Sequence, residues 1–322
     1  MRDEIGTITS AGAYAVEPAN FMERLNCITC NSTSLVTLDR GTFGQEPHRS
    51  MIAEGIWGIN PLPYLEHCEW ELVKCRDCGQ VFHKRILTPE WDARRHAEWM
   101  TRDAISEFEE LHGQRRPRWI FDRARSEVDR LLCFEQMTRG IRNEEPLRLL
   151  DFGCGWGRLV TLANLFGFSA HGVDRSNARR AGQQGGLGTV FASLDEYVAL
   201  EPRPAHAVCL MEVLEHLVAP MEILRALHSV MMPNAILLLE VPDATGLTDI
   251  KTTKNMVADG LDHLNAFTPR TLVDISKRAG FIPIERATAH VTADFQRVMR
   301  REVRRVLQPV LSGSTQQFFR RI

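Results

Sequence analysis

Four cysteines near the N-terminus have a spacing that indicates a metal site. They form two Cys-x-x-Cys pairs, Cys27 with Cys30 and Cys75 with Cys78. Each pair can present two thiolates on one side of a tight turn, and four thiolates complete a tetrahedral zinc site. Two such pairs without a preceding βαβ pattern favour a structural metal over a redox-active dithiol. Each Cys-x-x-Cys pair with its turn forms a knuckle, and the long separation between the pairs predicts an insertion between the two knuckles.

A second group of residues has the spacing of a ligand-binding loop. In the segment LLDFGCGWGRL at residues 149–159, three glycines occupy alternate positions after an apolar run. Such a loop lets the backbone approach a ligand closely. Arg158 stands where the dinucleotide fingerprint needs its third glycine, so the spacing argues against NAD. Asp174 lies about twenty residues after the loop, where a carboxylate can meet the hydroxyls of a ribose. The three glycines are Gly153, Gly155 and Gly157.

The elements that must position these residues are an alternation of strands and helices. Short apolar runs follow one another from Pro146 onward, separated by helix-like stretches. They cover residues 147–152, 170–173, 189–192, 205–211 and 235–241. This alternation predicts a doubly wound α/β domain with a mostly parallel sheet. Thr268 and Pro269 predict the cap and first turn of a further helix that ends at Arg278.

The part of the chain before this domain has a different texture. Residues 21–84 are rich in Gly, Pro, Cys and Thr, whereas residues 88–139 are charged and carry apolar residues at helical spacing. We therefore predict four parts. They are a zinc-ribbon-like module at residues 1–87, a helical bridge at 88–145, the α/β domain at 146–289 and a basic amphipathic C-terminal helix at 290–322.

The α/β part resembles the class I S-adenosylmethionine-dependent methyltransferases over roughly residues 147–284. Their first motif reads acid-x-Gly-x-Gly-x-Gly after an apolar strand, and Asp151 with the three glycines matches it in full. The likeness continues through Asp174 and through residues 211–217 and 262–269. It implies a Rossmann-like fold and S-adenosylmethionine as cofactor. The implied cofactor residues are Asp151, Gly153, Gly155 and Gly157 at the loop, Asp174 at the ribose, Ser193, Leu194 and Asp195 at the adenine, and Met211 after the fourth strand.

Other interpretations of these residues remain open. Three glycines can simply make a tight strand-to-helix turn, and Asp174 can simply cap the helix that follows it. The chain also departs from the family pattern, because His206 stands where Phe-Asp is common at the start of the fourth strand. The Arg-rich sequence after residue 287 predicts a helix rather than the usual antiparallel seventh strand, so we expect an incomplete or altered sheet edge.

Candidate catalytic residues follow the fourth and fifth strands, where open α/β sheets bind their ligands. Methyl transfer from a sulfonium is an in-line displacement with a neutral leaving group, so alignment and a base suffice. His263 is the first choice of base, although it can equally bond the backbone or cap a helix. Glu212 and His216 belong to a Glu-x-x-Glu-His run similar to that of ubiquinone-type O-methyltransferases. The same run also suits the beginning of a helix, and for these two residues we favour that structural interpretation.

Composition excludes several classes of protein. Of 322 residues, 44% are hydrophobic and 25% are charged, which is typical of globular chains and not of disordered or fibrous ones. A net charge of −2 provides no overall field for nucleic acid. Eight cysteines are too few for a disulfide scaffold, and no signal peptide or membrane-spanning stretch is evident, so we expect a cytoplasmic protein.

The C-terminal part is locally basic. Eight arginines lie between residues 286 and 322, beside apolar residues at helical spacing. We favour a terminal helix docked on the domain with its arginines in solvent. Contact with a membrane surface, an acidic partner or a phosphate group is the alternative, and membrane contact is expected nowhere else.

Together these features predict a methyltransferase that acts on a small-molecule acceptor, such as a sugar or nucleotide-sugar in polysaccharide or natural-product biosynthesis. That substrate class comes from the likeness to methyltransferases with an N-terminal zinc-binding module. Methylation of RNA or protein guided by the zinc module is an alternative, although nucleic acid is not the expected partner. A non-catalytic scaffold that keeps the fold is another, motivated by His206 and the expected sheet edge. The acceptor atom, whether O, N or C, and the oligomeric state are left open.

Overall fold

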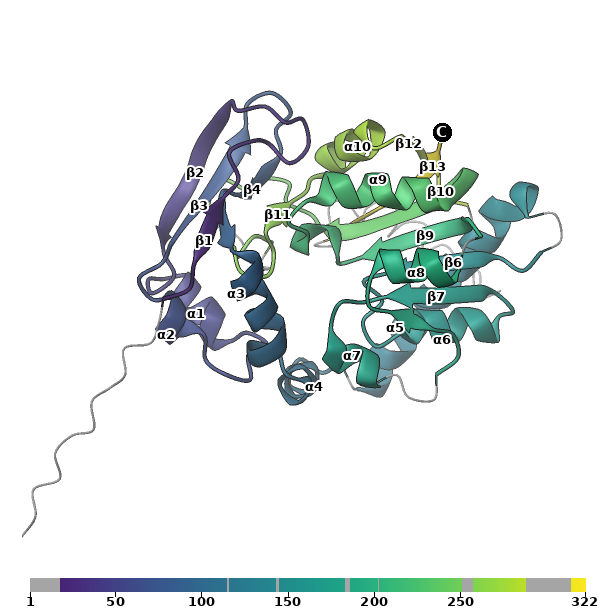
Figure 1. Cartoon of the computed structure of the whole chain (residues 1–322), viewed down its shortest axis with the longest axis horizontal. Helices are drawn as coiled ribbons and strands as arrows, with labels where there is room; N and C mark the ends of the chain where they lie inside the picture. The colour runs from purple at the N-terminus through teal and green to yellow at the C-terminus, as the bar shows by residue number, and fades with distance from the viewer. Residues whose placement is uncertain are drawn as a thin grey trace, which may run out of the picture.

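The computed structural model describes residues 18–114, 116–142, 145–182, 186–201, 203–250, 257–287 and 314–322. A seven-stranded sheet covered by helices forms one side of the molecule, and a smaller module of strands and short helices forms the other (Figure 1). The two are joined by the polypeptide and also by a small sheet to which both contribute strands.

The large sheet has the strand order β12-β13-β10-β9-β6-β7-β8. Its five central and edge strands from β8 to β10 are parallel, and β13 runs antiparallel to both of its neighbours. This arrangement confirms the expected doubly wound, mostly parallel sheet. The strands are β6 (Arg148–Phe152), β7 (Ser169–Val173), β8 (Val190–Phe191), β9 (Ala205–Met211), β10 (Met231–Pro242), β12 (Phe281–Ile284) and β13 (Ser314–Arg321).

Helices cover both faces of this sheet, which explains the continuous apolar runs in its strands. Along β10, Leu237 and Leu239 enter one buried cluster while Ile236 and Leu238 enter the cluster on the opposite face. The first cluster includes side chains of α8 (Leu194–Leu200), α9 (Pro220–Val230) and α10 (Pro269–Arg278). The second includes side chains of α5 (Pro117–Thr138) and α6 (Arg158–Leu165). A further short helix, α7 (Asn177–Gly182), follows β7.

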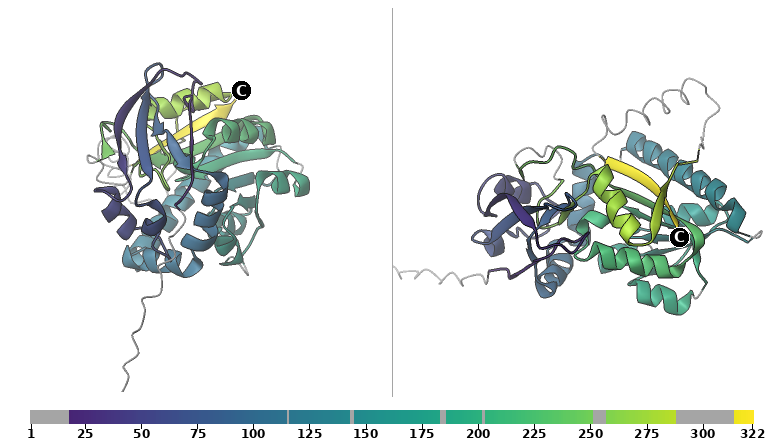
Figure 2. Two further views of the ribbon diagram at one scale, coloured as in Figure 1. Left: turned by 60° about the vertical axis from the view of Figure 1, so that its left-hand side comes forward. Right: turned by 90° about the horizontal axis from the view of Figure 1, so that it is seen from above.

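The sheet edge differs from the expectation. Residues 314–321, which were expected to be helical, form β13 and fill the position between β10 and β12 (Figure 2). Phe318 and Phe319 are buried on opposite faces of the sheet, in the two different core clusters. A strand is the conformation that sends neighbouring side chains to opposite faces, so pairing with β10 allows both phenylalanines to be buried at once. The edge is therefore complete, and the rest of the expected helix, residues 290–313, lies outside the described residues.

The segment between the module and the large sheet is helical, as expected. It begins with α3 (Pro89–Arg94) and a π-helical turn η1 (Arg95–Trp99), continues with α4 (Arg102–Leu111) and α5, and ends in the short 3₁₀ turn η2 (Arg139–Ile141). Trp91 and Trp99 are buried in the core of the N-terminal module, whereas Leu131 and Phe134 of α5 are buried against the large sheet. The helical segment therefore packs on both parts of the molecule.

The N-terminal module is built around a four-stranded sheet of order β11-β4-β3-β2. Three of these strands come from the module, and β11 (Asn265–Ala266) comes from the α/β domain after β10. The insertion expected between the cysteine pairs is present and contains most of the module's elements. The module consists of β1 (Phe21–Glu23), β2 (Leu35–Thr42), α1 (His48–Ala53), α2 (Leu62–Leu65), β3 (Glu69–Cys75), β4 (Val81–His83) and β5 (Arg85–Leu87). Across the described parts of the chain, no helix combines the length and the apolar character needed to span a membrane.

Candidate functional site

The glycine loop follows β6 and adopts a backbone that favours glycine. Gly153, Gly155 and Gly157 have φ angles of 78°, 57° and 69°, all in the left-handed region. A Cβ atom on Gly153 would lie 2.3 Å from Cγ2 of Val213, a residue of the segment after β9. The loop and the segment after β9 are therefore in direct contact, which is possible only because position 153 has no side chain.

Asp174 braces this loop from the end of β7. Its side chain is buried, with one carboxylate oxygen accepting a 2.8 Å hydrogen bond from the backbone N–H of Gly155. The other oxygen accepts a 2.8 Å bond from the N–H of Ser176. The carboxylate thus closes a local turn and also holds the glycine loop in place. The helix that follows is capped by Ser176 rather than by Asp174, because the Ser176 hydroxyl accepts from the N–H of Arg179 at 3.3 Å.

The other expected cofactor residues surround the same strand ends. Asp151 is buried at the end of β6, where burial raises the pKa of its carboxyl to about 7 and the Cys209 thiol donates to it at 3.3 Å. Ser193 caps α8, because its hydroxyl accepts from the N–H of Glu196 at 3.2 Å. The remaining residues differ in exposure: Leu194 and Met211 are half-buried, whereas Asp195 is exposed.

The expected catalytic residues after β9 form a short 3₁₀ turn, η3 (Leu214–His216). Glu212 precedes it with a φ angle of 55°, and the pKa of its carboxyl is raised by desolvation and by the neighbouring Glu240. Glu215 is almost fully buried, and neither of its carboxylate oxygens has a hydrogen-bond partner among the described residues. Burial raises the pKa of Glu215 to about 8, against the opposing charge of His216.

His216 and His263 come together although they follow different strands. Their ring centroids are 4.8 Å apart with the planes at 64°, in an edge-to-face arrangement. His216 Nδ1 lies 2.9 Å from the backbone oxygen and 3.3 Å from Oδ1 of Asp262. Burial disfavours a charged imidazole at His216, but Asp262 and Glu215 outweigh this effect and raise its pKa to about 10. Ligand-type atoms of Glu215, His216 and His263 all lie within 4.8 Å of one another.

A network of polar residues that the sequence did not single out holds this cluster. Asp262 connects His216 to Arg95 of the π-helical turn, whose guanidinium donates to Asp262 Oδ1 at 2.7 Å. Arg95 is buried and also pairs with Asp92, which in turn binds Arg175, the residue after Asp174. The local sequence offers only the pair with Asp92, three residues earlier, and does not reveal the distant partner Asp262 with which Arg95 is buried. Asp262 could have been noted as the acid beside His263.

Asp259 organises the loop that carries His263. One of its carboxylate oxygens accepts from the backbone N–H groups of Leu261, Asp262 and His263, at 2.7, 2.6 and 3.3 Å. These bonds involve the main chain of His263, so they do not test the alternative in which its imidazole bonds the backbone or caps a helix. The imidazole remains on the side of the loop that faces the His216 ring.

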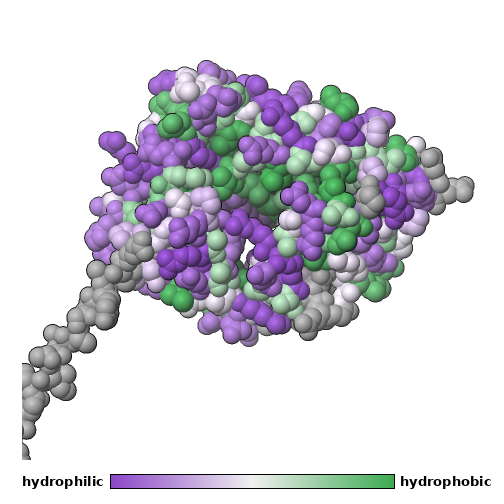
Figure 3. Space-filling model, in the orientation of Figure 1, coloured by the Kyte–Doolittle hydropathy of each residue, from purple (hydrophilic) through white to green (hydrophobic). Residues whose placement is uncertain are grey.

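The helical segment also reaches the glycine loop. Trp156, between two of the loop glycines, donates its indole N–H to Glu109 of α4 at 2.8 Å. In the view of Figure 3, the surface is hollowed near its middle, with apolar residues above the hollow and hydrophilic residues beside and below it. Through the Trp156 bond, and through Arg95 and Asp92, the helical segment contacts the glycine loop, Asp262 and Arg175.

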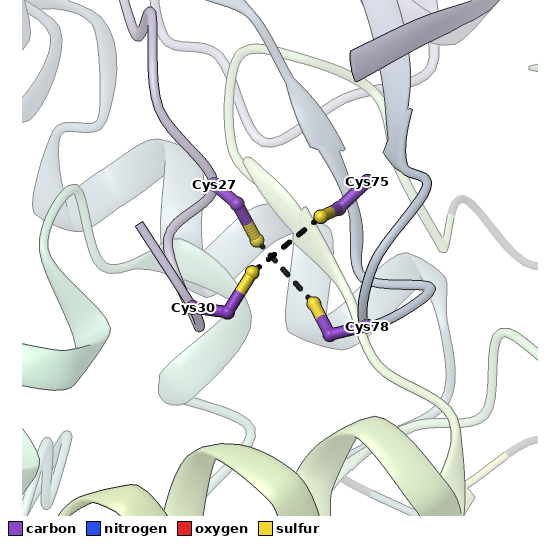
Figure 4. Close-up of side chains that lie close together, drawn as sticks. All are labelled: Cys27, Cys30, Cys75 and Cys78. Atoms are coloured by element: carbon purple, nitrogen blue, oxygen red, sulfur yellow. Dashed lines mark hydrogen bonds between the residues drawn. The ribbon is translucent and has the colours of Figure 1, made fainter. Parts of the chain in front are cut away.

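The four cysteines of the N-terminal module converge as expected (Figure 4). The Sγ atoms of Cys27 and Cys78 are 3.5 Å apart, as are those of Cys30 and Cys75, and all four lie within 4.8 Å of one another. A tetrahedral zinc with bonds of about 2.3 Å would separate its sulfurs by about 3.8 Å, whereas a disulfide needs about 2.05 Å. All four are free thiols, so the donor set and its geometry fit a zinc ion.

The chain was compared with proteins of known sequence. It is 32% identical to the ubiquinone biosynthesis O-methyltransferase of Caulobacter sp. (strain K31) over 156 residues, which cover 46% of this chain and 60% of the relative. It is 26% identical to the enzyme of the same name from Ruegeria pomeroyi over 197 residues, covering 56% of this chain and 79% of that one. The chain thus spans only 60% of the length of the first of these relatives.

The chain was also compared with solved structures. A SAM-dependent methyltransferase from Archaeoglobus fulgidus aligns with a TM-score of 0.41 and 20% identity, over 59% of this chain and 93% of that one. The family described as "Methyltransferase domain" matches residues 116–285, more than half of the chain, and its match includes the glycine loop, Asp174, the His216–His263 cluster and α5. The expected enzyme class is therefore confirmed at the level of the family: the chain belongs to the methyltransferase-domain family and has the class I, Rossmann-like fold.

Proposed function

We propose that this protein transfers the methyl group of S-adenosylmethionine to a hydroxyl group of a small molecule. One observation carries the proposal. The glycine loop is in contact with the segment that leads into η3, and η3 brings Glu215 and His216 beside His263. A methyl donor held at the loop and an acceptor held at the two histidines would therefore be neighbours, as an in-line displacement requires.

The cofactor would be held at the ends of β6, β7, β8 and β9. Gly153, Gly155 and Gly157 would allow the backbone to approach its methionine part, above the buried Asp151. Asp174 would accept from the ribose hydroxyls with lone pairs that its two backbone bonds leave available. Ser193, Leu194 and Asp195 would border the adenine, and Met211 would line the pocket beside Glu212. In the bound state the sulfonium supplies the methyl group and departs as a neutral thioether.

His263 would accept the proton of the acceptor hydroxyl. Asp262 raises the pKa of His216 to about 10 and so favours its charged form. A charged imidazole cannot act as a base, whereas it can orient an acceptor oxygen by donating to it. Glu212, at the entry to η3, would contact the acceptor from the side of β9. In this assignment His263 is the base, and His216 and Glu212 are two positioning groups.

The same cluster also offers the donors of a divalent cation site. One carboxylate and two imidazoles lie within reach of one ion, and the buried Glu215 oxygens have no hydrogen-bond partner among the described residues. A cation bound there would lower the pKa of an acceptor hydroxyl. In that case protein that keeps its four-cysteine zinc would lose activity with EDTA and regain it with Mg²⁺, which does not bind at four thiolates. An activity that EDTA leaves unchanged would support His263 alone as the base.

The acceptor would be a small molecule with a free hydroxyl. The two named relatives are O-methyltransferases of ubiquinone biosynthesis, which favours a phenol or catechol. A sugar or nucleotide-sugar remains the second candidate, on the likeness to methyltransferases with an N-terminal zinc module. Methylation of RNA or protein is the alternative against which these two candidate acceptors are tested. We further propose that Cys27, Cys30, Cys75 and Cys78 hold one structural zinc, and that the protein works in the cytoplasm, where these thiols stay reduced.

The cofactor site is tested by calorimetric titration with S-adenosylhomocysteine. Asp174→Ala should raise the Kd about tenfold or more, because the glycine loop loses its brace and the ribose loses its acceptor. Asp122→Ala, an exposed carboxylate on α5, is the matched control and should bind as the wild type does. Equal affinity in the wild type and Asp174→Ala would contradict the role of Asp174, and no binding to the folded wild type would contradict the cofactor site.

The acceptor side is tested with labelled S-adenosylmethionine and a panel of catechols, sugars, nucleotide-sugars and RNA. His263→Gln should slow transfer to the accepted substrate by about a hundredfold and leave S-adenosylhomocysteine binding unchanged. Glu222→Gln, at an exposed position of α9, is the control. An unaltered rate in His263→Gln would exclude His263 as the base and redirect attention to Glu212.

A further inference from the structure

We propose that the metal-bound four-cysteine centre positions the His216–His263 pair, through Arg24 and Gln80, and so does more than hold the N-terminal module together. The connection itself is a property of the fold. Its importance for methyl transfer rests on the function proposed above.

The first connection is a strand shared by the two parts of the molecule. In β11, Asn265 and Ala266 pair with Phe82 and Val81 of β4, so a piece of the α/β domain completes the module's sheet. The backbone oxygen of Leu264, just before β11, accepts from the N–H of His83 at 2.9 Å. The N–H of Leu264 donates to the backbone oxygen of Glu215, also at 2.9 Å. One peptide segment, next to His263, therefore joins β4 to η3.

The second connection is Arg24, three residues before Cys27. Its guanidinium donates to the backbone oxygens of His83 and Leu264, at 2.9 and 2.8 Å, and to the side-chain oxygen of Asn265 at 2.7 Å. Asn265 is fully buried and donates in turn to the backbone oxygens of Leu214 and Leu217, at 3.2 and 2.7 Å. Leu214 begins η3 and Leu217 follows it, so these bonds fix both ends of the turn that presents His216.

The third connection is Gln80, two residues after Cys78. Its side chain is fully buried and donates to the backbone oxygen of Ala266 at 2.8 Å. Its oxygen accepts from the hydroxyl of Thr29, which lies between Cys27 and Cys30, at 3.4 Å. Gln80 thus links both knuckles to β11, while Arg24 links the first knuckle to β11 and η3.

These contacts depend on a metal because the metal is what holds the two knuckles together. Four thiols that converge within 4.8 Å have no covalent link between them, and the free energy of binding a structural zinc is folding free energy for such a site. Without the ion the two knuckles can separate, and Arg24 and Gln80 move with them. The glycine loop is built on β6 and β7, which pair in the other sheet, so it should keep its structure.

The proposal is tested by hydrogen exchange on the full-length protein before and after zinc is removed with a chelator. Exchange at residues 264–266 should accelerate about tenfold or more, with little change at residues 153–157 and an unchanged Kd for S-adenosylhomocysteine. Three results would each overturn the proposal. Exchange could accelerate at the two knuckles but not at residues 264–266, or it could accelerate throughout the chain. The purified protein could also neither hold nor bind zinc. Failure of the intact, zinc-loaded protein to bind S-adenosylhomocysteine would contradict the proposed function instead, because the exchange result does not depend on the cofactor.

A variant test separates positioning from simple support of the module. In Arg24→Met, the imidazole signals of His216 and His263 should shift in the NMR spectrum while one zinc per chain is retained, and Arg24→Lys should restore part of the shift. Arg85→Met is the matched control, because Arg85 pairs with Glu23 and Glu69 and not with β11. Should Arg24→Met fail to fold, Gln80→Ala replaces it with the same expected shift. Wild-type imidazole signals in a folded variant that keeps its zinc would overturn the proposal.

Discussion

Asp174 satisfies two backbone N–H groups at once, those of Gly155 and Ser176. Asp259 does the same for three consecutive residues of the His263 loop, and Asn265 bonds both ends of η3. A short buried side chain that bonds several main-chain groups leaves few alternative conformations to the loop around it. The geometry of the site therefore depends on residues that need not touch a substrate.

His206 has a comparable structural role at the start of β9. Its ring is buried, and Nδ1 accepts from the backbone N–H of Arg148 at 3.0 Å. The neutral imidazole is the form that can accept there, and burial, together with the positive charge of Arg148, lowers its pKa to about 4. The departure from the family's Phe-Asp pattern is thus accommodated within the fold, which removes one reason for a non-catalytic scaffold.

The buried His206 predicts a specific loss of stability in acid. Its pKa is lower in the folded state than the usual value near 6.5, so its contribution is complete above pH 6.5 and declines as the pH falls toward 4. Between pH 7 and pH 5 the wild type should lose about 2 kcal/mol of unfolding free energy from this residue. His206→Asn keeps an acceptor without titrating and should lack this component. Urea denaturation at both pH values, with His112→Asn as an exposed control, measures it; equal pH dependence in the wild type and His206→Asn would contradict the assignment.

Strands β11 and β13 show how tertiary context decides an element. β13 carries two buried phenylalanines between glutamines and arginines, and it lies between β10 and β12. β11 is only two residues long, yet it completes the module's sheet. Neither has a local pattern of its own that requires a strand, and both exist because an unpaired sheet edge is available to bind them.

The importance of β13 can be measured through Phe319. This side chain is fully buried in the same cluster as Leu237, its partner in register on β10. Phe319→Ala should lower the free energy of unfolding by about 3–5 kcal/mol, through lost burial and the cavity that remains. Ile322→Ala, one residue beyond the neighbouring arginines and largely exposed, should change it by less than about 0.5 kcal/mol. Equal effects in chemical denaturation would mean that β13 does not contribute to the cooperative core.

The sequence identified those features that are encoded locally. Apolar runs predicted β6 to β10, and Thr268 with Pro269 predicted α10, because burial and capping leave a direct pattern in the chain. Two Cys-x-x-Cys pairs predicted the convergence of four thiols. The helical interpretation of residues 314–321 was wrong, since an Arg-rich context concealed a strand. Arg24 and Arg95 escaped notice because each is buried with distant partners that folding brings from elsewhere.

The N-terminal module and the α/β domain are parts of one structure rather than two independent units. The module's sheet includes β11, Arg24 reaches η3, and Arg95 ties the helical segment to Asp262. The loop that carries His263 is therefore held on one side by the module, through β11 and Arg24, and on the other side by the helical segment, through Arg95. A module that only accompanied the enzyme would not need contacts on the segment that carries the proposed base.

This integration predicts how the molecule should respond to the loss of one cysteine. Cys75→Ser removes one of four zinc ligands, so metal content should fall below one ion per chain, and the module should unfold at a lower temperature than the α/β domain. Differential scanning calorimetry should then show two transitions in place of one, the upper of which is raised by S-adenosylhomocysteine. Cys68→Ser is the matched control, because Cys68 is a half-buried free thiol of the same module outside the cluster. Loss of zinc in Cys68→Ser to the same degree would contradict the four-cysteine assignment, and a single unshifted transition in Cys75→Ser would show that the module's stability does not depend on the metal.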